Sequence, residues 1–417
     1  MTLDPVHVDG IAALASRVSD AVDERDHTEL AERAFEEFLD PLYDDGVVLE
    51  PVDELARRAV PAEDIALEGS PFETRHGLDA GTINPTTFEN GLVLDVSQAA
   101  MASVPSDLDL HRRRTIVMTV HTNDETVTVA DDGWTTDDEE YARQRVLRAP
   151  RVDRYEQTVV HALALYRAES EHALEQANAV EDLLVLDGPL YPTGLLQWVE
   201  RDPALERLII EEQEFTGVIE NYLRLVERFV ERGVPLIGFV KNTTSKAITQ
   251  TLREKTGSPW VDDAAFFRRA LAPRDDRSEA LTFTTWFRSR VGTDGLLADG
   301  EFAGGPFGGD RALGDGAYEL TFFVIYDPRE DLIYRVEAPY AFTRDPATRE
   351  RLTRHALSAV ATERGPPLAV GKADDLARIS RDGKRALRRR IEHAFDTEHR
   401  RGYNDKRWGQ AASAQPE

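Results

Sequence analysis

The sequence predicts an α/β protein in which a mixed sheet is flanked by helices, with an N-terminal helical region and additional C-terminal strands and helices. Short apolar, β-branched runs follow one another in the first third of the chain. Beyond about residue 150, such runs alternate with long stretches of helical apolar spacing. Consecutive strands favour an antiparallel meander, and strands separated by helices favour parallel pairing, so the two patterns together indicate a mixed sheet.

The chain divides into three predicted regions. Residues 1–65 are expected to be helical, 66–400 to form one large domain, and 401–417 to be a disordered tail. Apolar spacing places the first helices at 18–42 and 49–60. β-branched and apolar runs then predict strands at 73–82, 92–96, 115–121 and 125–130.

The rest of the chain alternates between the two kinds of element. Helices are expected at 152–177, 203–232 and 243–256, and the intervening strands at 182–187 and 235–240. Further strands are predicted at 281–287, 318–326 and 332–337, followed by helices at 346–362 and 372–395. The Gly- and Asp-rich segment 292–316 is expected to be a flexible loop.

Composition limits the class of protein. The 417 residues carry a formal net charge of -27 and include no cysteine, which excludes disulfides and cysteine-based zinc sites. An acidic chain poor in lysine suits a cytoplasm at molar salt, where the Debye length falls to roughly 3 Å. The charge then reports a halophilic habitat and does not exclude nucleic acid. Without a signal-like N-terminus or a long apolar run, the protein is expected to be cytoplasmic and not membrane-bound.

Two aspartates stand at the ends of apolar strands. Asp79 lies in HGLDAGT, and Asp187 ends the buried run in LLVLDGPL. Carboxylates at the ends of neighbouring strands form a site for Mg²⁺ or Mn²⁺, and two such ions can drive phosphodiester cleavage. Two aspartates are too few ligands, so a third or fourth acid is required. The alternative is that each aspartate only caps a turn.

Three further side chains are candidates with simpler alternatives. Lys241 ends the strand LIGFVK, where it can contact a phosphate or position water, or can be an ordinary surface lysine. Glu337 in YRVEAPY is a possible ligand or a solvent-facing residue. Asp374 stands near a helix start, where the helix dipole alone accounts for an acid.

Arginine clusters interrupt the acidic sequence. The candidates for phosphate contacts along a DNA channel are Arg112, Arg113, Arg114, Arg388 and Arg389, with a further basic group after residue 400. The alternative is that these arginines lie on solvated helix faces.

The motifs in their order resemble the NurA nuclease family. An Asp followed by small residues comes first, then a strand ending in Asp-Gly-x-Leu, a strand ending in Lys, a Val-Glu-x-Pro strand end and a late Pro-x-Leu segment. The resemblance runs from Asp79 to Ile379 and suggests a haloarchaeal type. It implies an RNase H-like core, whose element order the predicted elements match. It also implies Mn²⁺ (or Mg²⁺) at two ions per site and a toroidal homodimer.

The resemblance assigns roles to particular residues. Asp79 matches the first metal-binding Asp, Asp187 the Asp of the second motif, and Lys241 the lysine of the third. The family also has an acid on the helix between these strands. Glu156 is the best candidate as catalytic residue and ligand, with Glu169 and Glu171 as alternatives because the register of that helix is not fixed by the sequence.

Three positions depart from the family pattern. Ala80-Gly81 stands where Gly-Ser is usual, Pro189 replaces a Ser, and Asp374 stands where many relatives have His. As a metal ligand, Asp374 can replace that His with a carboxylate, which Mn²⁺ also accepts. If the His is an acid or base, the substitution puts activity in doubt.

The function implied is a metal-dependent deoxyribonuclease, a 5'-3' exonuclease and/or single-strand endonuclease. It would act in DNA double-strand break end resection with a HerA-type hexameric translocase ATPase. One alternative is a catalytically impaired RNase H-like adaptor that guides DNA for that ATPase. Another is a ribonuclease that acts on RNA–DNA hybrids.

Overall fold

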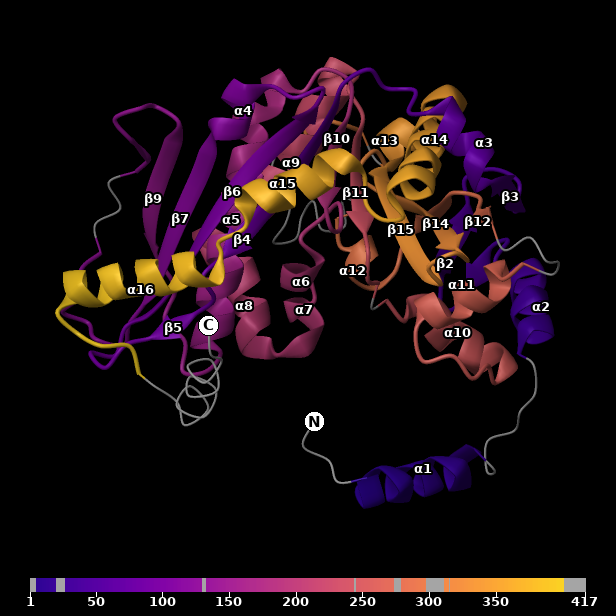
Figure 1. Ribbon diagram of the computed structural model, residues 1–417, viewed down its shortest axis with the longest axis horizontal. Helices are drawn as coiled ribbons and strands as arrows, with labels where there is room; N and C mark the ends of the chain where they lie inside the picture. Colours follow the sequence, from indigo (N-terminus) through magenta and orange to yellow (C-terminus); the bar gives the residue numbers. More distant parts are fainter. Residues whose placement is uncertain are drawn as a thin grey trace.

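The computed structural model describes residues 5–19, 27–129, 133–243, 245–273, 279–297, 311–314 and 316–400. In these residues a single 15-stranded sheet runs through the molecule, and helices cover it (Figure 1). The predicted α/β class, a mixed sheet flanked by helices, is confirmed. The strand order along the main path is β1-β2-β13-β14-β15-β11-β10-β4-β6-β7-β9-β8.

The middle of the sheet combines a meander with parallel strands. Its strands are β4 (Arg75–Thr82), β5 (Thr86–Thr87), β6 (Val93–Val104), β7 (Arg114–His121), β8 (Thr135–Thr136), β9 (Ala142–Arg148), β10 (Leu184–Asp187) and β11 (Leu236–Val240). Strands β4, β6 and β7 pair antiparallel, whereas β10 is parallel to both β4 and β11. The parallel pairs arise because helices connect these strands and return the chain to the same edge.

The remaining strands extend the sheet on the other side of β11. They are β1 (Leu42–Tyr43), β2 (Val47–Pro51), β3 (Arg57–Pro61), β12 (Ala280–Thr284), β13 (Phe287–Ser289), β14 (Leu320–Asp327) and β15 (Leu332–Pro339). Strand β15 pairs antiparallel with β11, so both halves of the chain share one continuous sheet.

The helices fall into two groups. Those up to β11 are α1 (Pro5–Ser19), α2 (Thr28–Phe38), α3 (Ala62–Glu68), α4 (Leu108–Arg112), α5 (Glu156–Gln176), the 3-10 turn η1 (Ala177–Ala179), α6 (Thr193–Leu196), α7 (Trp198–Arg201), α8 (Pro203–Glu211) and α9 (Gln213–Arg232). Those after it are α10 (Ala247–Thr256), α11 (Asp263–Leu271), α12 (Gly292–Gly295), α13 (Tyr340–Thr343), α14 (Pro346–Glu363), α15 (Leu368–Ala377) and α16 (Arg381–Phe395). No described helix is long and apolar enough to span a membrane.

The two faces of β4 carry different helices. A Cβ atom added to Gly77 would lie 2.3 Å from the carbonyl of Ala369, and one added to Gly81 would lie 2.3 Å from the carbonyl oxygen of Ala377. Only glycine therefore lets α15 lie this close to the strand. Asp79 stands between these glycines on the same face, because side chains alternate along a strand. The opposite face packs on α5, where His161 bonds Asp95 of β6.

Three clusters of buried apolar residues hold the helices against the sheet. The main core joins α5 and α9 to β10 and β11, with Leu163, Val226 and Leu184 among its buried members. A second core lies where α2 and α11 pack on β13 and β14, around Phe35 and Phe287. A third, small core lies under α16.

Two local predictions are wrong. The segment 49–60 was expected to be helical, but it contributes to β2 and β3, which pair with β13 and β12. Pairing with strands more than 200 residues later overrides its local helical pattern. No strand forms over 125–129. The strand beside β7 is instead β9, whose arginines hide the alternation expected of a strand, and the two-residue β8 forms the edge.

Other differences concern element ends. The predicted helix 203–232 is interrupted at Glu212, which separates α8 from α9. The predicted helix 372–395 is two helices, α15 and α16. The tail 401–417 and most of the predicted loop 292–316 lie outside the described residues, although α12 forms its beginning.

Candidate metal centre

The first two acids lie side by side on neighbouring strands. The last registered pair between β10 and β4 is Leu186 with Leu78, and the next residue on each strand is Asp187 and Asp79. Parallel neighbours lie about 4.8 Å apart, and residues in register point to the same face. Both carboxylates therefore emerge together on the face that α15 covers.

Both carboxylates are held in surroundings that disfavour negative charge. Burial, followed by the charges of Asp187 and Asp374, raises the pKa of Asp79 to about 7. Burial also raises the pKa of Asp187, against the opposing effect of Lys241. Buried acids that repel one another are typical of functional sites, because a bound cation relieves the repulsion.

Lys241 is the cation beside these acids. Its Nζ lies 2.8 Å from each oxygen of Asp187, and it donates a hydrogen bond to Oδ2. Among the described residues, the buried Oδ1 of Asp187 accepts no hydrogen bond of good geometry, although the Lys241 ammonium lies beside it. The Lys241 side chain is 41% exposed and that of Asp187 only 9%. The lysine thus covers the outer side of a carboxylate that is still short of partners.

The helix that crosses the sheet contributes Glu169. Burial, followed by the charge of Asp79, raises the pKa of Glu169 to about 8, and the charge of Asp187 adds to the effect. The Tyr222 hydroxyl donates to Oε1 of Glu169 at 3.1 Å. Glu169 is therefore the helix acid whose charge interacts with those of the two aspartates.

Glu156, which the sequence predicted as catalytic residue and ligand, does not lie with this group of acids. Glu156 opens α5, 13 residues before Glu169, which corresponds to about 20 Å along the helix. It lines a different pocket, together with His121 and Thr87. The sequence does contain a signal for Glu169, which stands between the buried residues Ala168 and Ser170.

The third candidate, Glu171, is already paired. Its Oε1 lies 3.0 Å from Arg167 and accepts a hydrogen bond from Asn221, while Oε2 lies 3.5 Å from Arg143. These partners satisfy the carboxylate on the helix side. The structure thus favours Glu169 over Glu171 and over Glu156, which the sequence had ranked first.

Asp374 completes the group of acids. It lies on α15 between the two alanines that contact β4, and its charge raises the pKa of both Asp79 and Asp187. It also forms an ion pair with Arg378 at 2.9 Å. Four acids from four elements therefore share one electrostatic environment: Asp79, Glu169, Asp187 and Asp374.

The donor set fits a hard divalent cation. Carboxylate oxygens are the ligands that Mn²⁺ and Mg²⁺ prefer, and Oδ1 of Asp187, which accepts no hydrogen bond of good geometry among the described residues, can bind an ion once the Lys241 ammonium moves aside. No three acid or imidazole side chains in the described ranges already converge on one ion position. The ion pairs of Asp187 with Lys241 and of Asp374 with Arg378 explain this, since each draws a carboxylate toward its own cation.

Glu337 has a structural role instead. Its Oε1 lies 2.7 Å from Nε of Arg335, and its Oε2 accepts the N–H of Leu190 at 2.9 Å. This buried carboxylate therefore fixes the turn after Asp187, in which Pro189 occurs. Both of its oxygens are used in doing so.

The arginine clusters lie at opposite ends of β6. Arg112 stacks on Tyr141, Arg113 donates to Gln176 at 3.0 Å, and Arg114 bonds backbone carbonyls near α4. Arg388 and Arg389 lie on α16, whose core contacts Leu94 at the start of β6, whereas α4 bonds Ser103 near its end. Nine residues of strand separate these points by about 30 Å, so the two clusters do not form one patch.

Comparison with known proteins identifies the fold. The sequence matches the model of the NurA domain family over residues 73–379. The NurA nuclease from Sulfolobus solfataricus has a similar structure, with a TM-score of 0.50 and 10% identity, covering 94% of this chain and 98% of that one.

Two other similar structures are described as NurA with manganese and NurA bound to dAMP and manganese. The first has a TM-score of 0.42 at 9% identity, covering 79% of this chain and 92% of the other. The second has 0.40 at 10%, covering 76% and 88%. No curated protein matches the sequence. Since the family match spans most of the chain and includes all four acids, the chain belongs to the NurA family.

Proposed function

We propose that this protein is a metal-dependent deoxyribonuclease whose Asp79, Glu169, Asp187 and Asp374 hold Mn²⁺ or Mg²⁺, with two ions per site. The observation that carries the proposal is the group of four acids from four elements, with raised pKa values at Asp79, Glu169 and Asp187. Two divalent ions at such a site activate the attacking water and stabilise the leaving oxygen of a phosphodiester. Members of the same family are described as binding manganese, and in one case dAMP.

The protein's own residues have distinct roles in this proposal. The paired strands β4 and β10 fix Asp79 and Asp187 in register, which sets the separation of their carboxylates. Tyr222 orients Glu169 through its hydrogen bond. Lys241 stands at the exposed side of Asp187, where its ammonium can contact a phosphate oxygen of the bound strand.

The wider biological role is also part of the proposal. The resemblance to NurA nucleases supports 5'-3' exonuclease or single-strand endonuclease activity in cytoplasmic end resection with a HerA-type ATPase. The order β7-β6-β4-β10-β11 supports an RNase H-like core. The exposed apolar residues Val8, Ile11, Leu14 and Val18 of α1 support a homodimer in which that face is covered.

The test is cleavage of end-labelled linear DNA with Mn²⁺ at about 2–3 M KCl. This salt concentration suits an acidic chain because it screens the repulsion between its negative charges. Wild type is compared with Asp187→Ala. We expect wild type to cleave and the variant to be inactive. Equal cleavage by both proteins would show that the site is misplaced or the activity is a contaminant. An RNA–DNA hybrid in parallel tests the ribonuclease alternative.

A second candidate function is a DNA-guiding adaptor without catalysis. It is favoured by the ion pairs that engage Asp187 and Asp374 and by the departures at Ala80, Pro189 and Asp374. Titration calorimetry with Mn²⁺ separates the two functions when combined with cleavage. An adaptor neither binds the metal through Asp187 nor cleaves DNA, even with the ATPase present.

A further inference from the structure

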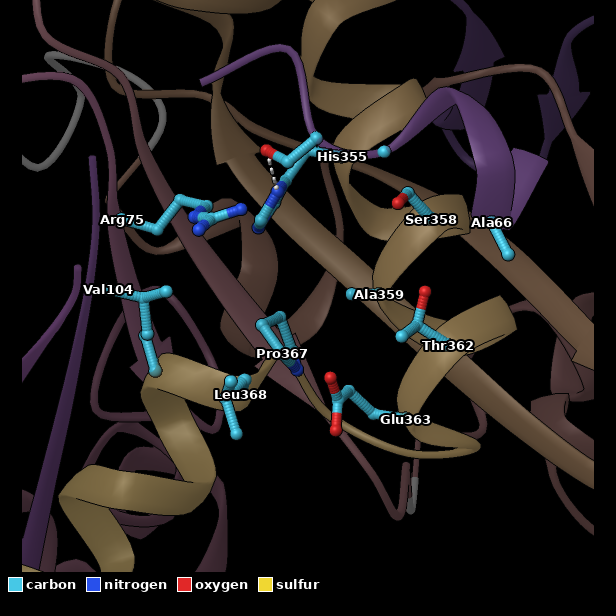
Figure 2. A pocket seen from close by; sticks show the side chains of 13 residues that line it. Ala66, Arg75, Val104, His355, Ser358, Ala359, Thr362, Glu363, Pro367 and Leu368 are labelled. Atoms are coloured by element: carbon cyan, nitrogen blue, oxygen red, sulfur yellow. Dashed lines mark hydrogen bonds between the residues drawn. The ribbon is translucent and has the colours of Figure 1, made fainter. Parts of the chain in front are cut away.

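A separate pocket lies at the other end of the α15–β4 contact. It has a volume of about 270 Å³ and is enclosed by the beginning of β4, the middle of α14 and the first residues of α15. Figure 2 shows Arg75 and His355 on one side, Ser358 and Thr362 on another, and Pro367 with Leu368 below them. Nothing in the proposed metal chemistry uses these residues.

Arg75 is a cation without a counter-charge. It is half-buried, and within the described ranges it has no ion pair, while its buried Nε has no hydrogen-bond partner. The chain has 77 acidic residues against 50 basic ones, so an unpaired arginine is not explained by a shortage of acids. The one carboxylate that lines this pocket, Glu363, is exposed. A guanidinium held in this way is suited to bind an anion from outside.

His355 offers a second donor. Its ring is 2% exposed, and Nδ1 lies 2.9 Å from Oγ of Ser70. The same oxygen accepts the N–H of Phe72 at 3.2 Å, so the Ser70 hydroxyl is free to donate to Nδ1. With the Ser70 hydroxyl donating to Nδ1, the ring proton is on Nε2, which is buried and unpartnered among the described residues, and we assign this tautomer. Figure 2 shows this nitrogen on the side of the pocket where Arg75 lies.

The N-terminus of α15 completes the pocket. The helix begins at Leu368 after Pro367 and has no side-chain cap. The N–H groups of Val370 and Gly371 already donate to the carbonyl of Pro367, at 2.8 and 3.2 Å, so those of Leu368 and Ala369 are left for a ligand. The helix dipole places partial positive charge there. Uncapped helix starts bind phosphate groups through these donors. Three independent donors, from β4, α14 and α15, therefore converge, and the exposed Glu363 opposes them from the rim.

We propose that this pocket binds a phosphate group through Arg75, Nε2 of His355 and the free N–H groups of α15, and that the phosphate belongs to the DNA strand being cleaved. The assignment to a DNA strand rests on the proposed nuclease function. Arg75 and Asp79 emerge on the same face of β4. Pro367 and Asp374 are seven residues apart and thus on one side of α15, separated by roughly 10 Å along its axis. That distance spans about three nucleotides of duplex at roughly 3.4 Å each.

The experiment measures binding of fluorescent DNA by anisotropy, with Ca²⁺ in place of Mn²⁺, over a series of KCl concentrations. For Arg75→Gln we expect about tenfold weaker binding and a salt slope lower by about 1. Arg75→Lys should keep the slope. The matched control is Arg354→Gln, an exposed arginine of α14 that pairs with Glu68, and it should bind as wild type does. Equal binding by wild type and Arg75→Gln would overturn the assignment to a DNA strand.

Two further measurements test the pocket itself. Inorganic phosphate should raise the melting temperature of wild type above that in chloride of equal ionic strength, and Arg75→Gln should lose this difference. Glu363→Gln, which removes the rim carboxylate, should bind phosphate more tightly; this variant decides the matter if Arg75→Gln does not fold. No phosphate-dependent shift in wild type or in Glu363→Gln would overturn the pocket. Mn²⁺-dependent cleavage by wild type separates this inference from the nuclease function: if wild type cleaves DNA but Arg75→Gln binds DNA as tightly as wild type does, only the phosphate pocket is overturned.

Discussion

Two groups of acids in this protein differ in how their charge is balanced. In the sheet half formed by β2, β13 and β14, Glu50 lies 2.9 Å from Arg288 and 3.0 Å from Arg290, and Glu319 lies 2.6 Å from Arg288. Two carboxylates thus face two guanidinium groups. In the metal centre, the cations that pair with the four carboxylates within the described part of the chain are Lys241 and Arg378.

The difference teaches which buried acids indicate function. An acid surrounded by its own arginines is satisfied within the fold and serves to hold strands together. Acids that are partly buried with too few cations destabilise the metal-free protein, and that arrangement persists in a protein when a ligand relieves it. The number of acids alone would not have distinguished the two groups.

The largest expected effect concerns the helix acid. Glu169→Gln should lower Mn²⁺-dependent cleavage by at least about 100-fold, since it removes a charge that faces the metal. Glu156→Gln, a matched change on the same helix, should leave cleavage near the wild-type level. Rates on end-labelled DNA measure both. A loss of activity in Glu156→Gln but not in Glu169→Gln would show that Glu156, as the sequence predicted, is the metal ligand.

Removing a carboxylate from the group in which acids face arginines should lower the stability of the fold and leave the cleavage rate unchanged. Glu319→Gln leaves Arg288 without its close partner, so we expect the free energy of unfolding to fall by about 3 kcal/mol. Denaturant unfolding at high KCl measures this change. Cleavage by the folded variant should be unchanged, and a loss of metal binding would contradict the separation of the two groups.

Neutralising an acid of the metal centre should raise the free energy of unfolding, the opposite of the effect expected for Glu319→Gln. The folded-state pKa of Asp79 is raised to about 7, so the folded protein at pH 8 carries a carboxylate that is less favourable than in the unfolded chain. Asp79→Asn should therefore raise the free energy of unfolding at pH 8 in EDTA by roughly 1–3 kcal/mol. It should also abolish the stabilisation by Mn²⁺. Below about pH 4 the two proteins should be equally stable, because the acid is then protonated in both states.

The smallest effect tests a buried base outside both groups of acids, one turn after Glu169 on α5. Burial lowers the pKa of His172 to about 3, whereas the unfolded chain titrates near 6.5. The unfolded state therefore binds the extra proton between these values, and stability falls as pH drops below 6.5. His172→Gln should remove up to about 1.4 kcal/mol per pH unit from that fall. Unfolding curves of both proteins from pH 4 to 7 measure the difference, and parallel curves would contradict it.

The sequence alone determined the mixed sheet and the pair Asp79 and Asp187. Each aspartate ends or interrupts an apolar strand, and the parallel pairing of β4 with β10 brings the two together. Lys241 was also evident, because it ends the next parallel strand. These features follow from local pattern and chain connectivity, which a sequence carries directly.

Only the tertiary structure decided the rest. Glu169 and not Glu156 faces the aspartates because the position of α5 along the sheet depends on packing between buried surfaces, which helical periodicity does not fix. The segment 49–60 is extended because β12 and β13 pair with it from far along the chain. Arg75 and His355 share a pocket although 280 positions separate them. Contacts between distant segments depend on the whole fold, and no local pattern encodes them.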